Sequence, residues 1–256
     1  MSEPLVSVVI TSYNRFDSLQ NSLKSVLEQD YENFEIFVVN DDSDDERYYE
    51  KNLNEKIKFI HIKRSETPDW GGSRQPLRNI AVKEANGKYI AFLDDDDIWM
   101  PKKLSQQIQS MEEKEFKFSS TEGFYGKGFF EKDKTYPLYN KKRWKKFIKR
   151  KYLFSKYFKI SSFPKVWTHD FIKIHNCIIC SSVVIEKELF EKSGGFRGIP
   201  RNSDYDLWLS VLKKEDLLYI DKPLFYYDDD HAGGRKYSKW VFLVLIIKMM
   251  EIFTLS

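Results

Sequence analysis

Apolar runs rich in β-branched residues alternate with helical stretches along the first 114 residues. Runs of this kind are typical of strands that are buried on both faces, and their alternation with helices predicts an α/β domain with a mostly parallel sheet. This order constrains the fold more than any other feature of the chain. The apolar runs span 5–15, 34–45, 57–64 and 88–97, and the helical stretches span 17–29, 76–87 and 101–114.

Three of these four predicted strands end in polar or acidic residues. The chain reads TSYN at 11–14, DDSDD at 41–45 and DDDD at 94–97. In an open parallel sheet, ligands bind in the crevice outside the carboxyl ends of the strands. We therefore expect these side chains to converge on one crevice, although they lie far apart in the sequence.

The four adjacent aspartates 94–97 are the densest group of like charges in this pattern. A divalent cation such as Mg²⁺ or Mn²⁺ prefers oxygen ligands, and it commonly takes one or two carboxylates together with the phosphates of a substrate. An isolated Asp-x-Asp is more often a solvated turn. Here the strand end, the charge density and the second cluster at 41–45 favour Asp94 and Asp96 as a site for a metal and a diphosphate.

Four sequence blocks occur in an order and spacing that resemble a known family. They read VSVVITSYNR, VVNDDSDD, RNIAVKEANGKYIAFLDDDD, and GGFR followed by SDYDLWL. Together they resemble the family 2 glycosyltransferases of GT-A fold, strongly over 4–110, weakly or not at all over 115–170, and recognisably again over 174–212. The resemblance implies a Rossmann-like, mostly parallel sheet flanked by helices. It also implies an inverting, metal-dependent hexosyltransferase that uses a nucleotide-diphosphate sugar.

The resemblance assigns several residues to the nucleotide. Thr11 and Tyr13 would line its pocket, with Tyr13 next to the base. Asp41 matches the acid that hydrogen-bonds the base, and the N–H of uracil or thymine suits it, which favours a UDP-sugar as donor. Arg78 matches the basic residue near the nucleotide and the diphosphate.

The resemblance also assigns roles to the aspartates 94–97, which we call the acidic turn. Asp94 and Asp95 are assigned to the nucleotide side, and Asp96 to a bound Mn²⁺ or Mg²⁺. The alternation of an extended chain points Asp95 away from its two neighbours, towards nearby backbone. Asp97 is expected to cap the turn into the helix that follows Pro101, or to support the site from behind.

Inversion at the anomeric carbon needs a general base that takes the proton of the acceptor hydroxyl. The family places an Asp there, in a Glu-Asp pair that opens a helix, and Asp204 matches it while Ser203 stands where Glu is common. Asp206 remains the alternative, since residues two apart on a helix point in different directions. His231 is a candidate metal ligand or phosphate donor, and a plain surface histidine is the other interpretation.

Residues 141–159 contain ten bases and no acid, with aromatic residues at helical spacing. They predict a basic amphipathic helix, which either lies on a membrane surface or packs its aromatic side on the domain. The apolar segment 240–256 predicts a C-terminal helix that forms either a second interfacial contact or a homodimer contact. We expect a nucleotide-sugar half at 1–114 and an acceptor half at 115–239 within one domain.

Charge and hydropathy limit the remaining functions. The net charge of +3 names no partner, and the acidic clusters would repel a nucleic-acid backbone. No apolar stretch reaches the ~20 residues of a membrane span, and no signal peptide is visible. Cys177 and Cys180 lie in an apolar run, 177–185, that predicts a buried strand, and without further ligands they are expected to be ordinary thiols of a reducing compartment. We therefore expect a cytoplasmic protein, peripheral at the inner face of the membrane.

The expected function is sugar transfer to a glycan or lipid-linked acceptor in the synthesis of a bacterial surface polysaccharide or glycoconjugate. A sugar nucleotidyltransferase is one alternative, but it normally has a glycine-rich loop after its first strand, and TSYNRFDS has no glycine. A non-catalytic, membrane-associated protein with the same fold is the other alternative. Asp96 and Asp204 argue against it.

Overall fold

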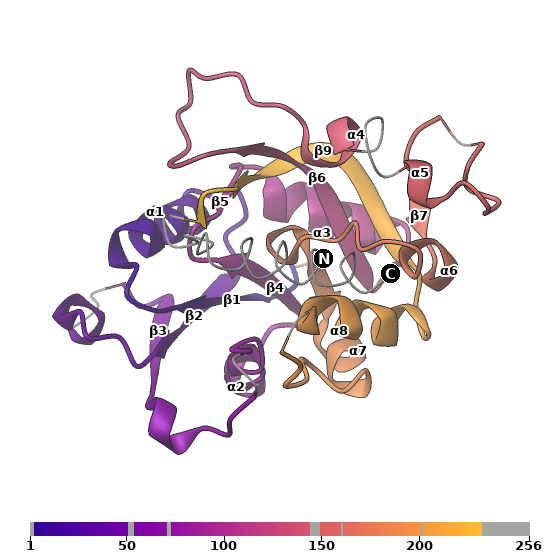
Figure 1. Ribbon diagram of the computed structural model, residues 1–256. Helices are drawn as coiled ribbons and strands as arrows, with labels where there is room; N and C mark the ends of the chain where they lie inside the picture. The colour runs from indigo at the N-terminus through magenta and orange to yellow at the C-terminus, as the bar shows by residue number, and fades with distance from the viewer. Residues whose placement is uncertain are drawn as a thin grey trace, which may run out of the picture.

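The computed structural model describes residues 3–50, 54–70, 73–143, 149–159, 161–200 and 202–231 (Figure 1). One sheet with the strand order β3-β2-β1-β4-β8-β6-β9-β5 runs through the molecule, and β7 pairs with β9. The strands from the first half of the chain are parallel to one another. They are β1 (Val6–Ser12), β2 (Phe34–Asp41), β3 (Ile57–Ile62) and β4 (Tyr89–Asp94).

Helices cover both faces of this parallel block, which confirms the α/β rhythm predicted for the first 114 residues. On one face, α1 (Phe16–Leu27) and α3 (Lys103–Glu113) pack Leu19, Leu104 and their neighbours on the sheet. On the other face, α2 (Leu77–Glu84), α7 (Lys187–Lys192) and α8 (Ser203–Leu212) do the same. Because β1, β2 and β4 are buried on both faces, their runs are apolar throughout rather than alternating.

The remaining strands complete the same sheet with mixed pairing. β8 (Val184–Glu186) pairs antiparallel with both β4 and β6 (Phe118–Gly126), and β6 is parallel to the long β9 (Leu217–Asp228). Two short strands pair antiparallel with β9, namely β5 (Ile98–Trp99) and β7 (Val166–Trp167). The remaining helices are α4 (Tyr139–Arg143), α5 (Lys149–Lys151) and α6 (His169–Ile172).

The expected strand over 177–185 is wrong for most of its length. Only Val184–Glu186 forms a strand, and Cys180–Ser182 forms a 3₁₀ turn. Local side chains compete for the backbone here, because the Ser182 hydroxyl donates to the Ile179 carbonyl and the Ile178 N–H donates to the Asn176 side chain. Cys177 and Cys180 are both buried free thiols.

The continuous helix expected over 141–159 is also wrong in the part that the structure describes. The chain forms only the short helices α4 and α5 and then a series of turns over 152–159. The buried Tyr152 and the half-buried Tyr157 hold these turns against the body, which a regular helix with one aromatic stripe would not do. The expected helix at 240–256 lies outside the described residues. Among the described helices, none is long and apolar enough to cross a membrane.

Candidate functional site

The predicted site residues gather at the carboxyl edge of the parallel strands. The β-sheet register pairs Thr11, next to the last residue of β1, with Asp94 on β4 on one side and Val39 on β2 on the other. Asp41 ends β2 in the same way. The topology thus brings together polar ends that are separated by more than eighty residues between Thr11 and Asp94.

The turn after β4 concentrates carboxylates that come from a single short segment. The carboxylate oxygens of Asp94, Asp96 and Asp97 include one from each residue that all lie within 4.8 Å of one another. Asp94 is held from α2, because the guanidinium of Arg78 forms an ion pair with its Oδ1. Arg78 is almost fully buried, and its charge therefore acts on Asp94 with little screening by water.

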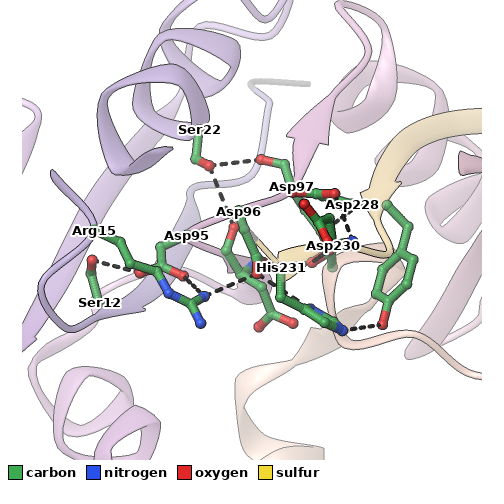
Figure 2. A network of polar contacts seen from close by, with 12 residues as sticks. Ser12, Arg15, Ser22, Asp95, Asp96, Asp97, Asp228, Asp230 and His231 are labelled. Carbon is green, nitrogen blue, oxygen red and sulfur yellow. Dashed lines mark hydrogen bonds and ion pairs between the residues drawn. The ribbon is translucent and has the colours of Figure 1, made fainter. Parts of the chain in front are cut away.

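Asp95 does not bond only to neighbouring backbone, so that expectation is wrong. Its carboxylate is buried and accepts hydrogen bonds from Ser12 Oγ at 2.7 Å and from Arg15 Nη1 at 3.2 Å, both from the end of β1 and the loop that follows (Figure 2). Burial, and then the charge of Asp96, raise the pKa of Asp95 to about 6. The tight turn, rather than an extended chain, directs this side chain towards β1.

Asp96 faces the two loops that lie on either side of the turn. Its Oδ2 lies 3.0 Å from Arg15 Nη1 and 3.3 Å from His231 Nδ1 (Figure 2). His231 follows β9, has a positive φ of 49°, and contacts the Tyr227 hydroxyl through its other ring nitrogen at 3.2 Å. The structure thus brings His231 next to Asp96, and a role of His231 as a metal ligand or phosphate donor stays a prediction.

Of the two expectations for Asp97, the cap of the turn into the helix after Pro101 is wrong, and the contacts agree with support of the acidic turn from behind. Its fully buried carboxylate accepts from the Ser181 hydroxyl and from the backbone N–H of Asp228 at 3.0 Å. Ser181 Oγ also accepts the backbone N–H of Asp94 at 3.0 Å. Burial raises the pKa of Asp97, and the charges of Asp96 and Asp94 raise it further. Asp97 therefore ties the acidic turn to β9 and to the 180–182 turn.

The donor set of this turn fits Mg²⁺ or Mn²⁺. Four carboxylates come from this turn, three of them grouped together, whereas Arg15 and Arg78 are the guanidinium groups that form ion pairs with the turn among the described residues. The site thus has more carboxylates than guanidinium cations, and all of the carboxylate donors are hard oxygens. Both properties match what a divalent cation requires.

The end of β2 has the opposite charge balance. The buried carboxylate of Asp41 accepts from Arg74 Nε at 2.9 Å and from Arg64 Nη2 at 3.0 Å. The Arg64 guanidinium also lies 3.7 Å from the centre of the partly exposed Tyr13 ring. A cavity of about 230 Å³ opens beside this pair, and it is lined by Arg64, Thr67, Pro68, Asp69, Trp70, Ser73 and Arg74.

Sequence reasoning missed Arg15, Arg64 and Arg74 as members of the site. Arg15 directly follows the polar end of the first strand, and Arg64 directly follows the third strand. A cation at either position has acids of the neighbouring strands within reach. Their positions after strands could therefore have identified Arg15 and Arg64 as members of the site. Arg74 lies in a loop whose path the sequence does not determine.

The first turn of α8 separates the two candidates for the general base. Asp206 forms an ion pair with the half-exposed Arg197. Asp204 is partly buried, and burial raises its pKa, the backbone N–H of Tyr205 lowers it, and the charge of Asp94 raises it again. Asp204 is therefore near the Asp94–Arg78 pair, and its carboxylate has no ion pair with any residue that the structure describes.

Comparison with known proteins gives consistent matches over most of the chain. The family model "Glycosyl transferase family 2" matches residues 7–168. A UDP-Glc:alpha-D-GlcNAc-diphosphoundecaprenol beta-1,3-glucosyltransferase of Escherichia coli, WfaP, is 33% identical over 240 residues, which cover 94% of this chain and 83% of that protein.

Two solved structures share the fold. The mannosyltransferase PcManGT from Pyrobaculum calidifontis, in complex with GDP-Man and Mn²⁺, superposes with a TM-score of 0.61 at 16% identity and covers 94% of this chain. Residues 1–349 of S. aureus TarS, in complex with UDP-GlcNAc, superpose with a TM-score of 0.56 at 18% identity and cover 90% of this chain. This chain spans 60% of each of those two chains.

Proposed function

Because this chain belongs to glycosyl transferase family 2, we propose that it moves a sugar from a UDP-sugar to a glycan or lipid-linked acceptor, with inversion at the anomeric carbon. The observation that carries the proposal is the acidic turn Asp94–Asp97, which has an excess of carboxylates, together with Asp204, which lies close to Asp94 and forms no ion pair with a residue that the structure describes. A nucleoside diphosphate is the leaving group that such a turn and a divalent cation suit.

Asp204 is the group that we assign as the general base. Its carboxylate takes the proton of the acceptor hydroxyl, and the hydroxyl oxygen forms the new bond to the anomeric carbon. The bond between that carbon and the diphosphate oxygen breaks on the opposite face, and its electron pair leaves with the diphosphate. The raised pKa of Asp204, caused mainly by burial, makes it a better proton acceptor than an exposed aspartate.

Residues of the acidic turn and of the segment after β9 would hold the cation. Asp96 and His231 are the proposed ligands, with Asp94 oriented by Arg78 and Asp97 held from behind by Ser181. When bound, Mn²⁺ or Mg²⁺ supplies positive charge that stabilises the leaving diphosphate. Arg15 would support Asp95 and Asp96 from the β1 side.

The nucleoside is proposed to lie between the ends of β1 and β2. Thr11, Tyr13 and Asp41 are the candidates of the first two strands, and Arg64 and Arg74 surround Asp41. Uracil is favoured because its N–H can donate to Asp41. The Escherichia coli relative is named for a UDP-Glc donor and a lipid-linked acceptor, which supports both parts of the proposal. A lipid-linked acceptor supports our proposal that the protein works in the cytoplasm, at the inner face of a membrane.

A donor panel tests this proposal. Purified protein with Mn²⁺ is incubated with UDP-glucose, UDP-GlcNAc or GDP-mannose and a panel of lipid-linked and free sugar acceptors, and nucleotide release and product are measured. We expect turnover with a UDP-sugar that stops when EDTA removes the metal. The anomeric configuration of the product, read by NMR, is expected to be opposite to that of the donor. Equal turnover with the GDP-sugar, or retention of configuration, would contradict the proposal.

A further inference from the structure

The chain that follows α5 presents large apolar side chains to solvent. Phe154 is 99% exposed and Leu153 is 48% exposed. Exposed bases surround them in the sequence, at Arg150, Lys151, Lys156 and Lys159. We refer to residues 150–159 as the basic tip. It begins within α5 and continues past it, at the edge of the molecule next to α6 and β7 (Figure 1).

Two tyrosines fix the basic tip to the body of the protein. Tyr152 is fully buried, stacks on the Phe171 ring at 4.9 Å between centroids, and donates its hydroxyl to the Phe171 carbonyl at 3.0 Å. Tyr157 packs edge-on against the same ring at 5.0 Å and contacts the Thr168 hydroxyl at 3.0 Å. The exposed Leu153 and Phe154 lie between these two anchors.

This arrangement divides four large side chains of the basic tip, those of Tyr152, Leu153, Phe154 and Tyr157, into an inward and an outward pair. The inward contacts with α6 are made by the tyrosines, whose hydroxyls find partners there. The outward position belongs to a leucine and a phenylalanine, which have no polar atom to hydrogen-bond with water. A solvated surface turn gains nothing from that choice, and burying such side chains is favourable wherever an apolar environment is offered.

The charge around these side chains identifies the partner. The whole stretch 141–159 contains no acid, and none of the four exposed bases of the basic tip forms an ion pair with a carboxylate of the described residues. Anionic lipid headgroups attract bases near a membrane surface, and apolar side chains enter the boundary between headgroups and acyl chains. We propose that the basic tip docks the protein on a bilayer that contains anionic lipids, with Leu153 and Phe154 inserted.

A nucleic acid would also attract the lysine and arginine side chains of the basic tip, but it would offer no apolar environment for Leu153. The proposal goes beyond sugar transfer and does not depend on it, because binding to vesicles is measured without donor, acceptor or metal. Donor binding can fail while vesicle binding stands, and the reverse is equally possible.

Vesicle flotation tests the insertion. Wild-type protein is mixed with vesicles of phosphatidylcholine alone or with phosphatidylglycerol added, and the floated fraction gives the affinity. We expect binding only when phosphatidylglycerol is present, with weaker binding at higher salt. Phe154→Ser should weaken binding about tenfold, since it removes one inserted aromatic ring. Phe129→Ser is the matched control, because Phe129 is 59% exposed outside the basic tip, and it should bind like the wild type.

A charge reversal tests the headgroup contact. Arg150→Glu with Lys156→Glu should reduce binding to phosphatidylglycerol vesicles by more than ~30-fold, since each base near the surface contributes to the affinity. Lys24→Glu with Lys192→Glu changes the net charge equally on α1 and α7, and it should have little effect. Phe154 is so exposed that its replacement leaves the fold intact, and circular dichroism verifies this for every variant.

Three outcomes would overturn the proposal. The first is equal flotation with and without phosphatidylglycerol, and the second is equal loss of binding in the two charge-reversal pairs. The third is binding to a single-stranded oligonucleotide that competes with vesicles and does not change with Phe154→Ser, which would assign the basic tip to nucleic acid instead.

Discussion

The ends of β2 and β4 lie at the same edge of the sheet, yet their carboxylates have opposite charge balances. At the end of β2, one buried carboxylate, that of Asp41, is shared by Arg64 and Arg74. At the end of β4 stand four aspartates, of which Asp94 pairs with Arg78 and both Asp95 and Asp96 pair with Arg15. We call a carboxylate matched when guanidinium groups balance its charge, and unmatched when they do not. A matched carboxylate stabilises the fold, whereas an unmatched one leaves negative charge that can bind a cation or a proton. The same contrast separates Asp206, which pairs with Arg197, from Asp204.

The largest effect is expected where an unmatched carboxylate performs chemistry. Asp204→Asn removes the proposed base and should lower kcat about 10²–10⁴-fold, while the affinity for the donor stays close to that of the wild type. Asp206→Asn, two residues away, breaks only an ion pair with an exposed arginine and should leave kcat within about twofold. Steady-state kinetics and donor titration measure both. A larger loss of kcat in Asp206→Asn than in Asp204→Asn would assign the base to Asp206.

Much of this contrast was visible in the sequence. The apolar runs of the first 114 residues predicted the parallel strands, because a strand buried on both faces has no solvent side to vary. The acids at 41 and 94–97 follow directly from those strand ends, so their convergence needed only the topology. The arginine partners of these acids could not be predicted in the same way. Arg64 and Arg74 reach Asp41 through a loop, and the path of a loop depends on contacts that periodicity does not encode.

The second half was predicted less well, for a physical reason. Strands such as β7 and β8 are two and three residues long, too short to show a periodic pattern. In the basic tip, the residues that face inward are tyrosines fixed by hydrogen bonds to α6, and aromatic spacing alone does not tell Tyr152 from Phe154. Individual side-chain contacts, rather than an amphipathic repeat, determine the structure of this region.

The second largest effect is expected on the affinity for Mn²⁺. Asp96→Asn removes one carboxylate from the unmatched cluster and should weaken Mn²⁺ binding by roughly 10–100-fold or more, as judged from the losses that substitutions around metal sites cause. The metal-free variant should also melt at a higher temperature than the metal-free wild type, because like charges then repel one another less. Calorimetric titration with Mn²⁺ and thermal melts in EDTA measure the two quantities. Unchanged Mn²⁺ affinity would show that the cluster does not hold the ion through Asp96.

The matched cluster should respond differently. Asp41→Asn leaves the guanidinium groups of Arg64 and Arg74 without their carboxylate, and it should lower the free energy of unfolding by about 1–3 kcal/mol. It should also reduce the preference for UDP over GDP. Mn²⁺ affinity should not change, since Asp41 lies outside the acidic turn. Asp42→Asn, at an exposed neighbour that accepts the Arg64 backbone N–H, is the control. A loss of Mn²⁺ affinity in Asp41→Asn would remove the distinction between the two clusters.

The smallest effect tests whether another cation offsets the charge of the acidic turn. Lys103, in the helix that follows the turn, is fully buried, donates to Gln107 Oε1 at 2.7 Å and lies 4.2 Å from the centre of the Trp99 ring. Burial lowers the pKa of Lys103 well below its usual value. The folded protein therefore binds this proton more weakly than the unfolded chain does. The stability contributed by Lys103 is complete above its usual pKa, near pH 10.5, and is lost as the pH falls towards neutrality.

Lys103→Met should therefore raise the melting temperature at pH 7 by a few degrees, which corresponds to about 1–2 kcal/mol, and the gain should shrink as the pH approaches 10. Mn²⁺ affinity should stay the same, because Lys103 forms no ion pair with the aspartates that the structure describes. Lys102→Met, at the exposed adjacent position, controls for the loss of a positive charge. If Lys103→Met instead tightens Mn²⁺ binding by much more than Lys102→Met does, the buried amine is charged and offsets the acidic turn. The four aspartates would then have one more counter-charge than their ion pairs indicate.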